Sequence, residues 1–227
     1  MAMILKKKGD QLEITERILE AAAGNRDDEV IARILEKKGD DVEITEKVLE
    51  AAASNPSAGE EVMALILEKK ADQIKITEKV LKAAAGHINS GIMALILEKK
   101  GDEVEITEGV LEVALGNAFG GEELMALILD KKGHQVEITD DTLKDVAEYM
   151  SSEMMALILE KKGDQADITE GVLEAAARNV FGCEMMALII HERGDQVEIT
   201  ENVFEAAADR FFGVEDMMAL LIEKQDY

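Results

Sequence analysis

The sequence has no tryptophan, and aromatic residues make up only 3% of its 227 residues. Apolar residues nevertheless reach 47%, so the core must be aliphatic and the chain is expected to fold. Proline occurs once, at Pro56. Because proline interrupts helices, this scarcity favours a helical protein.

Cysteine is equally rare. The single Cys183 excludes an internal disulfide framework and indicates a reducing compartment. The longest purely apolar stretches, such as Met185–Ile190, have six or seven residues, far fewer than the roughly 20 of a membrane-spanning helix. The N-terminal residues MAMILKKKGD have the pattern of a repeat helix rather than of a signal peptide. We therefore expect a soluble, cytoplasmic protein that does not enter membranes.

Basic residues are too few to balance the acids. There are 25 lysines and arginines against 49 aspartates and glutamates, which gives a formal net charge of −24. Proteins that bind DNA or RNA need a cationic surface that displaces counterions from phosphate. The charge therefore predicts no nucleic-acid partner and no attraction to anionic membranes.

The most regular feature of the chain is a threonine that recurs every 30 to 32 residues. In nearly every copy it ends a phrase of the type acid-x-aliphatic-x-Ile-Thr, and an alanine-rich segment usually follows it. A period near 31 residues that fills the chain is typical of stacked repeats. The threonines are Thr15, Thr45, Thr77, Thr107, Thr139, Thr169 and Thr200.

Each repeat has a first predicted helix, here called helix A. In the third copy it covers Glu60–Lys70, with acids at its start and lysines at its end, as the helix dipole favours. The sequence Met-Ala-Leu-Ile-Leu is apolar all round and predicts contacts on nearly every side. The alanine of this phrase, for example Ala126, is expected to mark the closest approach to a neighbouring helix. A glycine that usually follows the lysine pair, such as Gly101, is expected to end the helix in a left-handed conformation.

A tight connector leads to a second predicted helix, helix B. In the fourth copy the connector runs from Asp102 to Ile106, and Val104 and Ile106 alternate with acids. We therefore expect the connector to be extended, with Val104 and Ile106 turned inward. Thr107 is then expected to cap helix B by accepting a hydrogen bond from a free backbone N–H. Ile106 and Leu111 have the spacing of a hydrophobic staple.

Spacing separates a fixed from a variable part of the repeat. The methionine of helix A lies eight residues before the glycine position, and that position lies six residues before the threonine, as in Met125, Gly133 and Thr139. The distance from the threonine to the next methionine varies from 16 to 18 residues. The A-to-B turn is therefore predicted to be constant, whereas the B-to-A loop can change.

These patterns predict an all-α fold, an α-solenoid of about seven two-helix repeats with eight A helices and seven B helices. The first A helix begins at Met1, and the last one lies in MMALLIEKQDY. We expect one helical-repeat domain over residues 1–227. Terminal repeats normally carry polar caps, and the ends here are weakly capped, which leaves open that the chain is part of a longer parent protein.

The repeated phrase, seen in Met93–Asn117, resembles the short helical repeats of filamentous fungal NOD-like receptor proteins, where similar repeats follow a NACHT-type nucleotide-binding domain or lie near ankyrin arrays. The resemblance covers essentially the whole chain and departs at Lys75, Asp167, Arg193 and around Glu148–Ser152. It implies a recognition or sensor region without catalytic activity of its own.

No residue pattern points to catalysis, a cofactor or a metal. His87, His134 and His191 fall at unrelated repeat positions, and no nucleophile–base arrangement or phosphate-binding loop is present. Acids recur at the connector and at the start of helix B, as in Glu105 and Glu108. They fit either helix-dipole complementation and solubility or the binding of cations or a basic partner. We expect a protein that is not an enzyme and has no cofactor.

The rare aromatic residues are the candidate partner-binding residues. Phe119, Phe181 and Phe212 each lie 12 residues after a repeat threonine and precede glycine. They fit either interface anchors or plugs between helix B and the next helix A. With the other aromatics of these loops, the set is Phe119, Tyr149, Phe181, Phe211 and Phe212.

The sequence therefore predicts a scaffold that recognises a protein partner, with a basic surface as the complementary chemistry. The alternative is a structural module that stacks on other copies through its incompletely capped ends. The protein would accordingly be a monomer or an end-to-end oligomer.

Overall fold

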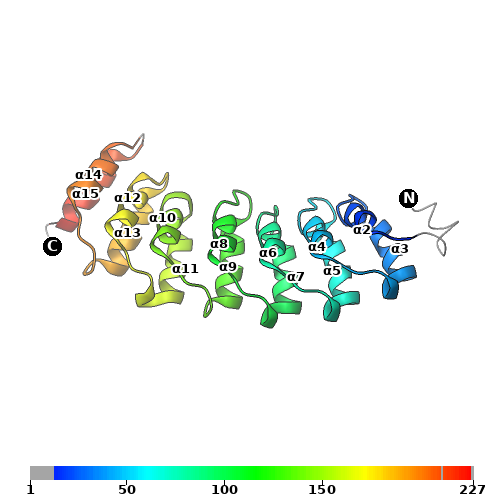
Figure 1. The fold of residues 1–227 in the computed structure, drawn as a ribbon. Coiled ribbons are helices and arrows are strands. Elements are labelled where there is room, and N and C mark those ends of the chain that lie inside the picture. The colour runs from blue at the N-terminus through cyan, green and yellow to red at the C-terminus, as the bar shows by residue number, and fades with distance from the viewer. Residues whose placement is uncertain (1–12, 211, 226–227) are drawn as a thin grey trace. The chain divides into compact units, whose positions relative to one another are not determined.

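The computed structural model describes residues 13–210 and 212–225, and the regular secondary structure in these ranges is entirely helical. Fourteen α-helices follow one another, and helices of type B and type A alternate (Figure 1). The prediction of an all-α repeat protein of the α-solenoid class is confirmed.

All seven predicted B helices are present, and each begins directly after its threonine. They are α2 (Glu16–Ala23), α4 (Glu46–Ala53), α6 (Glu78–Ala85), α8 (Glu108–Leu115), α10 (Asp140–Tyr149), α12 (Glu170–Arg178) and α14 (Glu201–Ala208).

Seven of the eight predicted A helices are present, and the first, over residues 1–8, lies outside the described residues. The seven are α3 (Glu29–Lys38), α5 (Gly59–Lys70), α7 (Gly91–Lys100), α9 (Gly121–Lys132), α11 (Ser152–Lys162), α13 (Gly182–Arg193) and α15 (Val214–Gln225).

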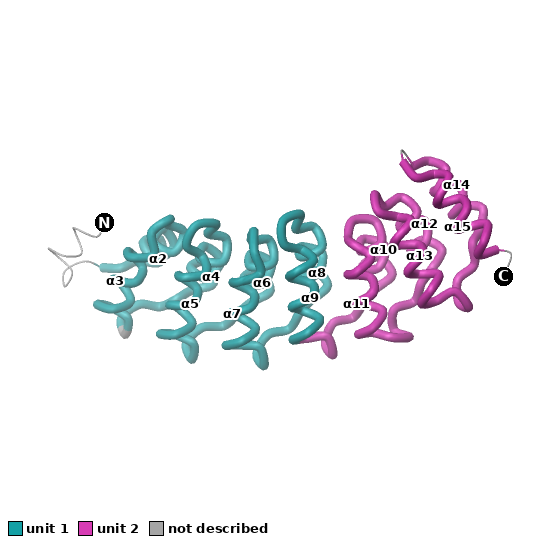
Figure 2. Tube along the Cα trace, turned by 180° about the vertical axis from the view of Figure 1, so that it is seen from behind, with its two compact units in different colours: residues 1–131 teal, residues 132–227 magenta. Residues whose placement is uncertain are grey.

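The chain forms two compact units, residues 1–131 and 132–227 (Figure 2). In the first unit α4 packs between α2 and α6, α8 packs on α6, and α5 packs between α3 and α7. In the second unit α12 packs between α10 and α14, and α13 packs between α11 and α15. B helices thus pack on B helices and A helices on A helices within each unit. We predicted a single domain over residues 1–227, and the division into two compact units does not test that prediction.

The core of each repeat is aliphatic, as the composition predicts. Met63 and Ile66 of α5 and Val80 of α6 are fully buried. The alanine pair that ends helix B, Ala52 and Ala53 in α4, is also fully buried. Small residues at this position allow the B helices to pack closely against the helices around them.

The A-to-B turn is constant, as predicted. Four copies contain a short 3₁₀ turn: η2 (Gly39–Asp41), η3 (Ala71–Gln73), η4 (Gly101–Glu103) and η5 (Gly163–Gln165). Val104 and Ile106 follow in an extended segment and are buried, which confirms their inward orientation. Asp102 and Glu103, predicted as extended, lie instead in the 3₁₀ turn.

The prediction of a left-handed glycine after helix A is wrong in most copies. Gly39 and Gly101 have φ values of −52° and −49°, and Ala71 at the same position has −47°. The chain runs from the α-helix into the 3₁₀ turn without reversing its hand, so a side chain is tolerated. Only Gly163 among these residues is left-handed, at φ 52°.

The alanine of helix A does not mark the closest approach, so this prediction is also wrong. Ala126 is half-buried and Ala187 is exposed. The tight contact lies at the start of helix A, where an ideal Cβ on Gly59 would come 2.6 Å from the carbonyl oxygen of Ala52. Helix A therefore keeps one side in partial contact with solvent, although its sequence is apolar all round.

Candidate functional site

Each repeat threonine occupies the N-cap position of helix B with an extended backbone, as predicted, but most of the hydroxyls do not cap the helix. Only Thr139 and Thr169 accept a backbone N–H of their own helix. Instead, the hydroxyl donates to the first acid of the preceding B helix, because a charged acceptor makes the stronger hydrogen bond. These acid–threonine links are Thr45–Glu16 (2.8 Å), Thr77–Glu46 (2.7 Å), Thr107–Glu78 (2.9 Å), Thr169–Asp140 (2.6 Å) and Thr200–Glu170 (2.5 Å).

Four of these acids also pair with a lysine, and their pKa values are lowered: Glu16, Glu46, Glu78 and Asp140. For Glu46 the hydroxyl of Thr77 is the main cause of the lower pKa, followed by the ammonium group of Lys79. For Asp140 the pKa is lowered first by Lys144 and then by Thr169. The sequence left two roles for the acids at helix starts: helix-dipole complementation with solubility, or the binding of cations or a basic partner. The structure adds a third role, because these carboxylates accept hydrogen bonds from the next repeat.

The first or second residue after helix B also contacts the preceding repeat in most copies. Asn117 donates from Nδ2 to the carbonyl oxygens of Ala85 (2.8 Å) and His87 (2.6 Å). Its Oδ1 accepts the backbone N–H groups of Phe119 and Gly120. The loop is therefore held on both sides by one side chain. We call these residues the loop links: Asn55, His87, Asn117, Asn179 and Arg210.

The lysine pair that ends helix A divides into an exposed and a buried residue. Lys161 is exposed, whereas Lys162 is buried and donates to the carbonyl oxygens of Gly133 and Val136 in the preceding repeat. Burial lowers the pKa of Lys162. The buried lysine thus stabilises the stack, and only the exposed one faces solvent.

The described aromatic side chains of the predicted set are exposed. The exposed fractions are 85% for Phe119, 71% for Tyr149, 62% for Phe181 and 85% for Phe212. Tyr149, predicted in a loop, is instead the last residue of α10, and Phe211 lies outside the described residues. The plug interpretation is wrong for Phe119, Phe181 and Phe212, because a ring that filled the space between helix B and the next helix A would be buried.

Two further apolar side chains belong to this surface. Val180 is 82% exposed and Ile88 is 54% exposed, and both lie directly after a loop link. Sequence reasoning missed them because aliphatic residues are abundant here and were assigned to the core. Their position within the variable loops, outside the helix periodicity, is the signal that could have found them. The B-to-A loops lie along one edge of each unit, opposite the A-to-B turns (Figure 1).

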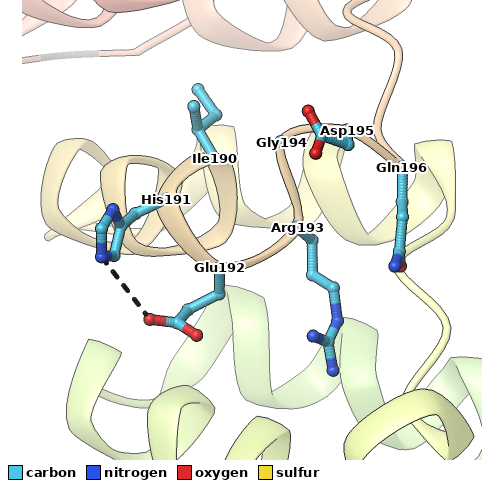
Figure 3. Close-up of a pocket in the computed structure, with 7 residues that line it drawn as sticks. All are labelled: Ile190, His191, Glu192, Arg193, Gly194, Asp195 and Gln196. Carbon is cyan, nitrogen blue, oxygen red and sulfur yellow. Dashed lines mark ion pairs between the residues drawn. The ribbon is translucent and has the colours of Figure 1, made fainter.

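A cavity of about 380 Å³ lies between α13 and α15 and is lined by Ala187, Ile190, His191, Leu220, Glu223 and Lys224. A shallow cavity of about 190 Å³ lies at the end of α13 and is lined by Ile190 to Gln196 (Figure 3). Arg193, one of its lining residues, donates to the carbonyl oxygen of Gly163, 2.9 Å away. The matching turn after α7 holds a similar cavity of about 150 Å³. Recurrence at the same turn indicates a packing feature.

Two absences hold for the described residues. No helix among them is long and apolar enough to cross a membrane. In the same part of the chain, no three His, Cys, Asp or Glu side chains gather in a way that could hold a metal ion.

One family model matches the chain in seven consecutive segments, and its description is a domain of unknown function (DUF7104). The segments are residues 3–30, 34–63, 65–92, 95–125, 127–155, 157–186 and 188–217. Each segment contains one repeat threonine, so the model follows the same period as the structure. No curated protein and no solved structure matches the chain significantly.

Proposed function

Because the chain belongs to the DUF7104 family, whose members are domains of unknown function, we propose its function from its surface: it is a non-catalytic helical-repeat scaffold that recognises a protein partner through the B-to-A loops. The observation that carries this proposal is the exposure of three rings on these loops, Phe119, Phe181 and Phe212, and of Tyr149 at the end of α10. Exposed aromatic residues dominate the energetics of many protein interfaces.

The polar contacts of the loops support this proposal, because polar side chains hold the loop backbone while apolar side chains remain exposed. Asn117 and Asn179 hold their loops against the preceding repeat, yet the next residues turn their side chains to solvent. A loop that is fixed in its backbone and exposed in its apolar side chains loses little conformational entropy on binding. The net charge of −24 favours a basic partner and speeds its association. On the resemblance to fungal NOD-like receptor repeats, we extend the proposal to a sensor region of such a receptor.

The test substitutes Phe119 and Phe181 by serine and compares capture of a partner from the source cell with that of the unmodified chain. We expect lost capture and an unchanged melting temperature, because both rings are already exposed in the free protein. Ile222→Ser, which removes an exposed side chain outside the loops, is the matched control. Unchanged capture by the double variant, or a lowered melting temperature with normal capture, would contradict the proposal.

A second candidate is self-assembly, and it is favoured by the last described helix. Ile222 of α15 is 54% exposed, whereas Leu67 and Leu129 at the same position of α5 and α9 are 3% and 2% exposed. Met218 is half-buried, although Met63 at its position is fully buried. The face of α15 that other repeats cover is therefore open to another repeat.

A further inference from the structure

Two neighbouring loops of the second unit are held together by one arginine. Arg210, in the loop between α14 and α15, donates from Nη1 to the carbonyl oxygens of Ala177 (2.5 Å) and Asn179 (2.8 Å). Its Nη2 lies 3.5 Å from the carbonyl oxygen of Val180, and its Nε donates to that of Phe212 at 3.1 Å. One guanidinium group thus fixes the backbone on both sides of the junction between the two loops.

The same two loops carry the densest group of exposed apolar side chains among the described residues. Val180, Phe181 and Phe212 are 82%, 62% and 85% exposed. Phe181 and Phe212 occupy equivalent positions, each 12 residues after its threonine. Stacked helices lie about 8–10 Å apart, so the two rings are presented one repeat spacing apart.

This spacing matches an α-helical ligand. A helix rises 1.5 Å per residue, so side chains seven residues apart lie on one face about 10.5 Å from each other. Two such apolar side chains can contact Phe181 and Phe212 at once.

The acidic residues around the rings favour a positively charged ligand. Glu184, Asp209, Glu215 and Asp216 flank the two loops and are exposed. Arg210 is the one basic residue of the two loops in the described part of the chain, and it donates to carbonyl oxygens. The four exposed carboxylates outweigh this one positive charge, which favours a cationic ligand.

We propose that the Phe181–Phe212 pair is a binding site for a basic amphipathic α-helix of a protein partner, with apolar side chains seven residues apart and lysines or arginines beside them. The inference rests on the proposed recognition function and names the class of its ligand. Arg210 acts as a positioning residue, because its N–H groups fix the backbone of the two loops.

The test measures fluorescence anisotropy of a labelled 18-residue peptide of leucine and lysine, whose leucines form one face of a helix, with the full chain. We expect binding that weakens with salt and exceeds that of a scrambled peptide of the same composition. The double variant Phe181→Ser, Phe212→Ser should raise Kd about tenfold or more. Ile222→Ser, which removes an exposed apolar side chain of the same unit outside the loops, is the matched control and should leave Kd unchanged.

A second variant tests the positioning role. Arg210→Asn places at this loop link the residue found in three other loops, so the contact with the preceding repeat is kept while the bond to the carbonyl oxygen of Phe212 is lost. We expect an intact circular-dichroism spectrum and a raised Kd. Equal binding of the two peptides, or an equal loss of affinity in Ile222→Ser, overturns the proposal.

The outcomes separate this proposal from the function on which it rests. If the leucine–lysine peptide does not bind but Phe181→Ser still abolishes capture of the cellular partner, the ligand class is wrong and the recognition scaffold stands. If no loop substitution affects capture, the recognition function itself fails.

Discussion

At the scale of single residues, a threonine hydroxyl and a loop-link side chain join successive repeats within each unit. Thr77 donates to Glu46 of the preceding repeat, and Asn55 donates to carbonyl oxygens of the repeat before its own. Two residues that replace asparagine, His87 and Arg210, still make a cross-repeat contact: His87 Nε2 lies 3.0 Å from the carbonyl oxygen of Asn55. Polar side chains of different types can therefore make this contact.

The acid–threonine link predicts a pH-dependent stability difference. Thr77→Val should lower the melting temperature at neutral pH, because it removes the hydroxyl that, with Lys79, lowers the pKa of Glu46 below its ordinary value of 4.5. A lowered carboxyl pKa stabilises the fold above the unfolded-state value, and this stabilisation is lost as the pH falls through the folded-state pKa. The difference between the variant and the unmodified chain should therefore shrink below about pH 4.5.

Thermal melts at a series of pH values measure this difference, and Thr77→Ser, which keeps the hydroxyl, is the control. A difference that stays constant down to pH 3 would show that Thr77 acts through packing alone.

Sequence reasoning placed these residues correctly but not their partners. Thr107 lies at the helix start because its extended backbone and position in the repeat are local properties. The direction of its hydroxyl depends on Glu78, which is 29 residues away and reaches it only after the helices stack. The sequence period identifies equivalent positions, whereas contacts between repeats can be identified only from the three-dimensional structure.

At the scale of elements, the tightest packing lies where helix A begins. Gly59 is buried, and a Cβ there would lie 2.6 Å from the carbonyl oxygen of Ala52 and 3.0 Å from Ile92 Cδ1. Gly101, at the end of helix A, has no atom within 4 Å of such a Cβ. Close packing therefore explains the glycine at position 59, whereas it does not explain the glycine at position 101.

This contrast predicts opposite effects of the same substitution. Gly59→Ala should destabilise the fold by about 1–3 kcal/mol, since it forces backbone to move in a packed region. Gly101→Ala should stabilise it by about 0.4–1 kcal/mol, because its φ of −49° suits alanine and the unfolded chain loses freedom. Urea denaturation measures both free energies of unfolding. Equal effects of the two substitutions would contradict the assignment of the close contact to the start of helix A.

The sequence predicted the helices, their order and the constant turn, because hydrophobic periodicity and helix-start residues are encoded within each repeat. It did not predict which side of helix A is open. Ala126 looks like a contact residue in a phrase that is apolar all round, yet it is half-buried. The exposure of Phe181 was likewise undecided from the sequence, because an aromatic ring beside glycine can either fill a gap or face solvent.

At the scale of the whole molecule, the exposed face of α15 provides a test of the self-assembly candidate. If the open face of α15 stacks on another copy, sedimentation velocity should show a mass that rises with protein concentration. Ile222→Lys should abolish this rise, because it places a charge at the centre of the contact.

Ile88→Lys is the control, since Ile88 is also 54% exposed but lies in a loop. A mass that stays that of a monomer over the concentration series rules out stacking through α15. Loss of association in the Ile88 variant alone would assign self-association to the loops.

The reach of the cross-repeat hydrogen bonds has a consequence for how such a chain can evolve. The acid–threonine and loop-link bonds join residues that are 29 to 33 positions apart, which is one repeat. Duplication or excision of one whole repeat within a unit therefore gives each new neighbour a donor and an acceptor of the same kind. Copy number can change in steps of about 31 residues while these bonds are kept, and each step adds or removes one B-to-A loop.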